Sequence, residues 1–233
     1  MPDKANPRIA LLGNPNAGKS SLFNKLTGLN QKTGNFPGVT VEKKVGYFSH
    51  NRTKYEIIDL PGLYSIFPKS YDEEIVYDYL TSDEEDKKLD AVIVVADVSN
   101  FRRNLLLFSQ IYDLQIPVIL ALSMVDVAEK DKLFIDQKLL QSRLNIPIVE
   151  INSRIGKGVD EIKNQLSNIN TDRRKTLLDV SKVLDQPIKK IKDLTQTENP
   201  YLALTKIAHT KIVLHKKERS AKYDALLEEV QFD

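Results

Sequence analysis

The sequence of 233 residues contains no cysteine and only three histidines. Without cysteine the chain has no disulfide and no thiolate metal site. His209 and His215 are six residues apart, so on a helix they would lie on different faces, and the third histidine is His50. We therefore expect no transition-metal site in this chain.

Long apolar runs and an excess of one charge are also missing. No run approaches the ~20 apolar residues that span a bilayer, and the start lacks the pattern of a secretory signal, so we expect a soluble chain that is not exported. The 34 basic and 32 acidic residues give a net charge of +2, which offers no electrostatic case for binding nucleic acid. The length fits one domain of ordinary size plus an appendage.

Apolar runs and helical patterns alternate through the first 170 residues. The predicted strands are Ile9–Leu12, Val41–Phe48, Tyr55–Leu60, Ala91–Ala96, Val118–Leu122 and Ile148–Ile151. Four of them are nearly continuous apolar runs, as in a parallel sheet buried on both faces, whereas the second and third resemble a hairpin at the sheet edge. The pattern predicts an α/β fold with a mostly parallel six-stranded sheet and helices on both faces.

Helices are expected between these strands. Ser70 and Glu73 form a capping box, which predicts a helix through about Leu80, and Asn100 is predicted to cap the next helix. Further helical segments are expected at 136–144 and 159–169.

The character of the sequence changes at residue 171. Strand patterns disappear, and helical spacing continues at 177–184, 188–194, 201–214 and 221–230. We therefore expect two domains, an α/β domain at 1–170 and a small all-helical domain at 171–233.

A glycine-rich loop, GNPNAGKS, joins the first apolar run to a helix-like stretch. In a P-loop the backbone N–H groups converge on an anion, and the positive end of the next helix points at it. Lys19 is expected to reach the β and γ phosphates, and the Ser20 hydroxyl is expected to hold Mg²⁺. The predicted nucleotide contacts from this loop are Asn14, Asn16, Ala17, Gly18, Lys19, Ser20 and Ser21.

A second phosphate motif, Asp59-Leu60-Pro61-Gly62, lies 40 residues beyond Lys19 at the end of a predicted strand. In switch GTPases this DxxG aspartate holds Mg²⁺ through water, and the glycine N–H meets the γ-phosphate. Thr40, just before the second predicted strand, is the expected threonine ligand of Mg²⁺ when a triphosphate is bound. We assign catalytic roles to Lys19, Thr40 and Gly62.

The base is expected to be read after the strand Val118–Leu122, where the chain has Ser123-Met124-Val125-Asp126. Asp126 can accept from N1–H and N2–H₂ of guanine, a pairing that adenine cannot offer. Ser123 stands where asparagine is expected, so we predict the loss of a bond to guanine N7 and of a brace on the P-loop, about 1–3 kcal/mol of affinity.

A last base contact is expected from Asn152-Ser153-Arg154, where a backbone N–H near Ser153 would meet guanine O6. This assignment rests on position after the last strand, because the contact needs a backbone group and no particular side chain.

The order of these motifs resembles the cytosolic N-terminal G domain of the bacterial ferrous iron transport protein B family. The resemblance covers about residues 7–170 and is carried by GNPNAGKSSLFNKLTG, TGNFPGVTVEKK, DLPGLYS, ADVSNFRRNLLL and ALSMVDVAEK. The tail matches the accessory helical domain of that family in place, size and helix content.

The resemblance implies that the chain is the nucleotide-binding part of a polytopic Fe²⁺ transporter, at the cytoplasmic face of the inner membrane. Its partner would be the membrane-embedded transport domain of the same parent protein, and the appended helices would favour the GDP-bound state. No direct iron site is expected in this chain.

The resemblance also implies that Asn16 binds K⁺ beside the phosphates, together with the carbonyls of Gly34 and Phe36, and so joins Lys19, Thr40 and Gly62 as a catalytic residue. A physical reason supports a catalytic cation. Leu63 stands where Ras-like enzymes place a glutamine that orients water, so catalysis depends on electrostatic stabilisation and backbone positioning.

The leading interpretation is a slow, K⁺-stimulated GTP hydrolase that regulates an iron transporter. Three alternatives stay open: an RNA-associated assembly GTPase, a nucleotide-dependent interaction module with negligible turnover, and a P-loop protein that tolerates ATP because Ser123 relaxes the base pocket.

Overall fold

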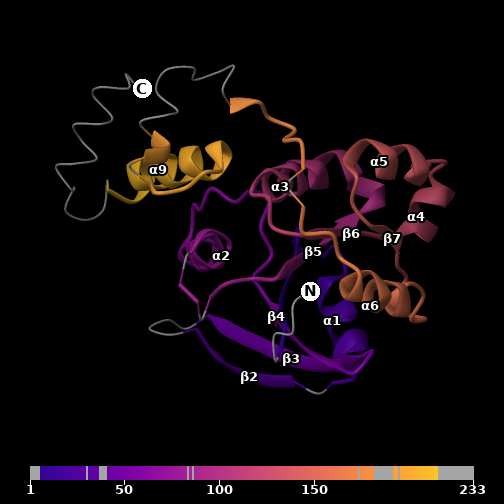
Figure 1. Ribbon diagram of the computed structural model, residues 1–233. Coiled ribbons are helices and arrows are strands. Elements are labelled where there is room, and N and C mark those ends of the chain that lie inside the picture. Colours follow the sequence, from indigo (N-terminus) through magenta and orange to yellow (C-terminus); the bar gives the residue numbers. More distant parts are fainter. Residues whose placement is uncertain are drawn as a thin grey trace. The chain divides into compact units, whose positions relative to one another are not determined.

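Figure 1 shows the computed structural model of the protein. The structure describes residues 6–29, 31–36, 41–82, 84–85, 87–172, 174–180, 191–193 and 195–214. The chain divides into two compact units, Met1–Lys175 and Thr176–Asp233. Within the described residues, every helix is too short or too polar to span a membrane.

The first unit contains a seven-stranded sheet in the order β2-β3-β4-β1-β5-β6-β7. The strands are β1 (Arg8–Gly13), β2 (Gln31–Asn35), β3 (Glu42–His50), β4 (Thr53–Asp59), β5 (Ala91–Asp97), β6 (Val118–Ser123) and β7 (Ile148–Glu150). Strand β1 pairs in parallel with both β4 and β5, and parallel pairing continues to β6 and β7. Only β2 and β3 introduce antiparallel pairs.

The predicted count of six strands is wrong, because β2 is a seventh. Its sequence, QKTGN, is polar, and all five of its residues are exposed. The strand is held by backbone pairing to β3, so no alternation of apolar and polar side chains announces it. The hairpin β3–β4 is consequently one strand in from the edge, which β2 occupies.

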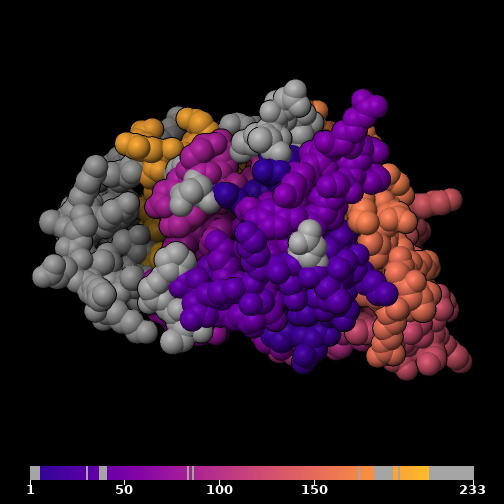
Figure 2. Space-filling model, turned by 90° about the horizontal axis from the view of Figure 1, so that it is seen from below, coloured from indigo at the N-terminus to yellow at the C-terminus, as the bar shows by residue number. Residues whose placement is uncertain are grey.

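The helices of this unit cover both faces of the sheet (Figure 1). They are α1 (Lys19–Thr27), α2 (Tyr71–Thr81), α3 (Phe101–Asp113), α4 (Val125–Lys130), α5 (Gln137–Leu144) and α6 (Val159–Ser167), with a 3-10 turn η1 (Val98–Asn100) before α3. Helices α1 and α6 share a buried cluster with alternate residues of β1, such as Ile9 and Leu11, whereas α3 contacts β1, β5 and β6. Seen from below, the indigo and purple segments that hold α1 and β2–β4 lie beside the orange segment that holds α6 (Figure 2).

The capping predictions have mixed outcomes. The Ser70 cap that opens α2 is confirmed, because Ser70 Oγ accepts from Glu73 N at 3.4 Å. The Glu73 carboxylate accepts from Lys69 N at 2.7 Å, one residue before the N–H that a capping box uses. Asn100 does precede α3, but its side chain does not cap that helix. Instead it donates to the Asp97 carboxylate at 3.1 Å. Asp97 is also the residue that caps η1.

In the second unit the structure describes one long helix, α9 (Pro200–Leu214), at the predicted segment 201–214. The side chain of Asn199 accepts from Tyr201 N at 2.9 Å and so caps its start. Residues 177–179 are not helical, and the chain enters a helix at Val180. Most of the predicted segments 177–184 and 188–194, and all of 221–230, lie outside the described residues.

Gly46 on β3 is the point where the hairpin packs most tightly on α1. A Cβ at this position would overlap the Thr27 side chain and lie 3.0 Å from Phe23 Cζ. We therefore expect Gly46→Ala to lower the free energy of unfolding by about 1–3 kcal/mol through overpacking, measured by urea denaturation. Gly34→Ala on β2 is the matched control, since a Cβ there meets nothing within 4 Å. Equal losses in both variants would contradict the packing described here.

Candidate functional site

The turn from β1 to α1 brings backbone groups to the edge of the sheet. At Gly13 a Cβ would lie 2.6 Å from the Val95 carbonyl oxygen, so only glycine allows this close approach to β5. Gly18 has a φ of 91° and stands at the start of α1, which has no side-chain cap. The N–H groups of the first turn are therefore open to a ligand.

A hollow of about 530 Å³ opens at this turn. It is lined by Asn14, Pro15, Asn16, Gly18, Lys19, Ser20, Ser21, Gly62 and Met124. Of the other predicted loop residues, Ala17 is buried and its N–H donates to the Asn14 carbonyl at 3.2 Å, which closes the loop from beneath. The structure thus brings the P-loop together with Gly62 of DxxG and Met124 of the predicted base-reading segment.

Lys19 and Asp59 form an ion pair that joins the two phosphate motifs. The register of β1 and β4 places Leu11 opposite Asp59, so this carboxylate ends its strand at the same edge as the P-loop. The side chains of Lys19 and Asp59 are only 12% and 7% exposed. A mostly desolvated pair of this kind holds both groups in fixed positions.

The oxygen ligands present fit Mg²⁺ as the hard cation that accompanies phosphates. Asp59 offers a carboxylate and Ser20 an exposed hydroxyl, while Thr40 lies outside the described residues. One carboxylate and one hydroxyl suit Mg²⁺, which keeps several waters and shares phosphate oxygens with its ligand.

The DxxG segment lies against the P-loop. Leu63 N donates to the Gly13 carbonyl at 3.3 Å, and a Cβ on Gly62 would lie 3.2 Å from Pro15 N. The Leu63 side chain is 1% exposed and belongs to the core. It therefore cannot orient a water molecule at the hollow.

Helix α3 holds the residues that follow DxxG, an arrangement that the sequence analysis missed. Gln110 Oε1 accepts from Ile66 N at 2.9 Å, and Gln110 Nε2 donates to Ser65 Oγ at 3.0 Å. The Arg103 guanidinium lies 4.0 Å from the centre of the Tyr64 ring, a cation–π contact. No motif in the sequence marks Gln110, because its two contacts join residues 44 and 45 positions apart.

Ser123 corrects one part of the prediction. Its hydroxyl donates to the Ala17 carbonyl at 2.7 Å and lies 3.2 Å from the Ala96 carbonyl, so the brace on the P-loop is present. The reason is register: Ser123 ends β6 opposite Asp97 of β5, close enough for a short side chain to reach the loop. Met124 follows with a φ of 57°, and Asp126 is exposed in the first turn of α4.

The segment Asn152–Arg154 forms a tight turn beyond β7. Asn152 pairs with Lys157 in an isolated bridge, and its side-chain oxygen accepts from Arg154 N at 3.1 Å. The N–H of Ser153 has no hydrogen-bond partner among the described residues. This is the backbone group that the sequence analysis places at the base.

The predicted K⁺ ligands are not brought together. Gly34 lies on the outermost strand β2, and β3 and β4 separate that strand from β1 and the adjoining Asn16. Phe36 is buried at the end of β2, edge-on to Tyr79 with ring centres 5.6 Å apart. Backbone pairing with β3 and this aromatic contact hold the segment away from the P-loop.

Comparison with known families matches residues 7–166 to the family described as ferrous iron transport protein B. The chain belongs to this family. The matched range includes the P-loop, DxxG and both predicted base-reading segments, so the resemblance stated from the sequence is confirmed.

Two relatives illustrate the relationship to the ferrous iron transport protein B family. The Fe(2+) transporter FeoB of Leptospira biflexa is 43% identical over 170 residues, which are 73% of this chain and 24% of the relative. That of Salmonella typhimurium is 42% identical over 168 residues, 70% of this chain and 21% of the relative. The chain spans about a fifth to a quarter of the length of these curated relatives.

Solved structures of the same family confirm the α/β fold class. A GDP-bound mutant of the S. thermophilus FeoB G-domain has a TM-score of 0.80 and 33% identity, covering 96% of this chain and 87% of that one. The cytosolic domain of T. maritima FeoB in GDP form II has a TM-score of 0.77 and 35% identity, covering 97% and 94%. Both matches cover more of the chain than the family match at residues 7–166.

Proposed function

We propose that this chain binds GTP and GDP and hydrolyses GTP, as the regulatory nucleotide-binding part of an Fe²⁺ transporter. The observation that carries the proposal is the hollow at the β1–α1 turn. There Lys19 meets Asp59 and Ser123 meets Ala17, so three nucleotide motifs converge on one sheet edge. Solved relatives from S. thermophilus and T. maritima are named as GDP complexes.

The phosphates would occupy the hollow in front of α1. The open first-turn amides and the positive end of this helix favour an anion, and Lys19 exchanges Asp59 for the phosphate oxygens. Asp59, freed from the pair, is then available to Mg²⁺ through water, with Ser20 as a direct ligand and Thr40 as a further proposed ligand. Bound Mg²⁺ would neutralise charge on the phosphates.

Guanine would be read from the side of α4 and the turn after β7. Asp126 is exposed and accepts from N1–H and N2–H₂, and the free N–H of Ser153 donates to O6. Met124 lines the same hollow. Because the Ser123 hydroxyl keeps the P-loop brace, the affinity it forfeits is that of the N7 bond alone, about 0.5–1.5 kcal/mol.

Hydrolysis would depend on charge stabilisation, since the buried Leu63 orients no water. The Gly62 N–H and Lys19 supply two positive groups, and we propose K⁺ held by Asn16 as a third, with slow turnover. Gly34 and Phe36 would join this site only if β2 leaves β3, a rearrangement of the kind that switch segments undergo. The same burial of Leu63 favours, as second candidate, an interaction module with negligible turnover.

The partner that we propose is a membrane-embedded domain of the same parent protein, with this chain at the cytoplasmic face of the inner membrane. The support is that the relatives are named Fe(2+) transporters and that this chain matches only about a fifth of their length. The helices of 171–233 would stabilise the GDP-bound state of the nucleotide-binding part.

Guanine specificity gives the most direct test of the proposal. We expect wild type to bind fluorescent mant-GTP and mant-GDP, with ATP competing poorly, and Asp126→Ala to weaken both by roughly tenfold to a hundredfold, since bonds to a charged acceptor contribute about 1.5–3 kcal/mol. Asp131→Ala, an exposed acid just beyond α4, is the control and should bind as wild type. No binding by wild type, or equal losses in the two variants, would reject this site.

Ser123→Asn tests the assignment of the base pocket. An asparagine that reaches guanine N7 and keeps the bond to Ala17 should tighten GTP and GDP by roughly tenfold, about 1.4 kcal/mol. Ser123→Ala removes the brace and should weaken both nucleotides. Titration of mant-nucleotides measures the two effects, and an asparagine variant that binds no better than alanine would remove Ser123 from the base pocket.

Asn16→Ala tests the proposed cation. Single-turnover hydrolysis of GTP by wild type should be faster in K⁺ than in Na⁺, and the variant should lose this difference while it keeps most of its affinity for GDP. Stimulation by K⁺ that survives the substitution would dismiss Asn16 as a ligand. Equal, near-background rates of wild type in both salts would favour the interaction module.

A further inference from the structure

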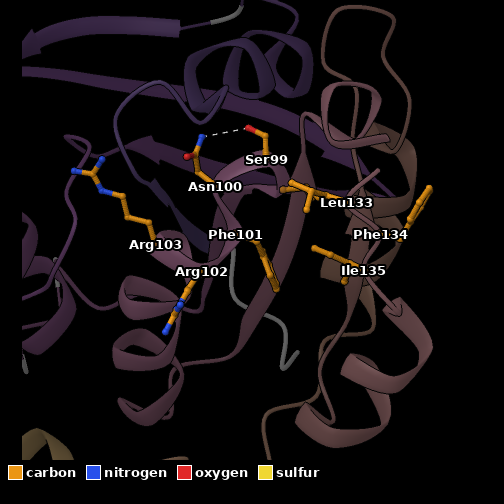
Figure 3. Close-up of a pocket in the computed structure, with 9 residues that line it drawn as sticks. Ser99, Asn100, Phe101, Arg102, Arg103, Leu133, Phe134 and Ile135 are labelled. Atoms are coloured by element: carbon orange, nitrogen blue, oxygen red, sulfur yellow. Dashed lines mark hydrogen bonds between the residues drawn. The ribbon is translucent and has the colours of Figure 1, made fainter. Parts of the chain in front are cut away.

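We propose that a groove between the start of α3 and the α4–α5 connection is a docking site for a protein segment that carries a bulky apolar side chain next to a carboxylate. The groove has a volume of about 590 Å³ and is lined by residues 98–103 and 133–135 (Figure 3). None of these residues lines the hollow at the P-loop. The inference therefore stands independently of the proposed nucleotide binding.

The wall of the groove formed by residues 133–135 is apolar and incompletely covered. Phe101 points toward the loop that carries Leu133 and Ile135, whereas Phe134 projects away from α3 (Figure 3). The side chain of Phe134 is 78% exposed, and that of Leu133 is 47% exposed. Adjacent exposed apolar side chains beside a hollow are typical of a binding surface, where aromatic anchors contribute most.

The apolar surface continues along α3 beyond the groove itself. Leu106, one turn after Arg102, is 54% exposed. The exposed Leu106 on α3 and the exposed Phe134 on the α4–α5 connection suit a protein segment that contacts both.

The charge of the groove selects an acidic partner. Among the described residues that line it, the charged ones are Arg102 and Arg103, and none is a carboxylate. Arg103 is engaged on the Tyr64 ring, whereas Arg102 is exposed and has no hydrogen bond or ion pair within the described part of the chain. Arg102 is thus the group available to a carboxylate of the partner.

Asp97 and Asp136, the acids next to the groove lining in the sequence, each have local hydrogen-bond partners. Asp97 accepts from Ser99 N at 2.8 Å and from Asn100 Nδ2 at 3.1 Å, which fixes η1. Asp136 accepts from Leu139 N at 2.9 Å and caps α5. The guanidinium of Arg102 lies at the rim of the groove, on the other side of Phe101 from Leu133 and Ile135 (Figure 3). An apolar segment that carries one acidic residue at its end complements this arrangement.

The hydrogen bonds around η1 lie outside the proposed phosphate and base sites, and they hold one wall of the groove in place. Buried Asn104 donates to the Asn100 carbonyl at 2.9 Å and accepts from Asp97 N at 3.3 Å, so it locks the wall that carries Phe101 and Arg102. A rigid wall lowers the entropy lost when a partner binds.

Selection from a random peptide library displayed on phage tests the proposal, with wild-type chain as bait and the Arg102→Glu variant for counter-selection. Enriched peptides should combine a bulky apolar residue with Asp or Glu. A synthetic peptide of the enriched sequence, followed by fluorescence anisotropy, should bind at least about tenfold more weakly to Arg102→Glu and to Phe134→Ser. Both side chains are exposed, so neither change disturbs the core.

Matched controls are Ile155→Ser and Arg52→Glu, exposed residues outside the groove lining, which should bind as wild type. A peptide with its acid changed to lysine should recover binding to Arg102→Glu. Absence of enriched peptides, enrichment without an acidic residue, or affinities that the groove variants leave unchanged would each overturn the proposal.

Discussion

Parallel pairing of β1 with both β4 and β5 is the constraint on which the site depends. It sets the carboxyl ends of three strands at one edge, where Asp59 reaches Lys19 and the end of β6 reaches the P-loop through Ser123. The approach of Gly13 to the Val95 carbonyl makes this edge compact enough for such short contacts. Asp59 and Ser123 are therefore positioned by the register of strands in a buried sheet.

Much of this arrangement is predictable because its signals are local. The buried strands are apolar runs, the P-loop and DxxG follow two of them directly, and Ser70 with Glu73 starts α2 by a contact three residues long. Strand β2 escaped prediction because its five side chains are exposed and only backbone pairing forms it. The brace from Ser123 to Ala17 spans 106 residues, so only the folded sheet reveals it.

Helix α3 contributes residues to two surfaces beyond the sheet edge. On one side Gln110 and Arg103 hold the residues after DxxG, and on another its first turn forms the wall of the groove. Ser123 bonds to carbonyls of both the P-loop and β5. The end of β5, which leads into the groove, is therefore linked to the phosphate loop through this side chain. Shared support of this kind is what allows one site to bias another, provided that the element has two arrangements.

The proposed K⁺ site requires strand β2 to leave β3, and two kinds of contact oppose this change. The five exposed side chains of β2 lose little burial, but its backbone bonds to β3 would break, and Phe36 would leave its packing against Tyr79 at a cost of about 1.5–3 kcal/mol. A ligand that binds only the rearranged form contributes about 2.7 kcal/mol at a hundredfold excess over its Kd. A nucleotide that moves the segment must therefore favour the rearranged form by more than the cost of the Phe36 contact, because the backbone bonds to β3 add to that cost.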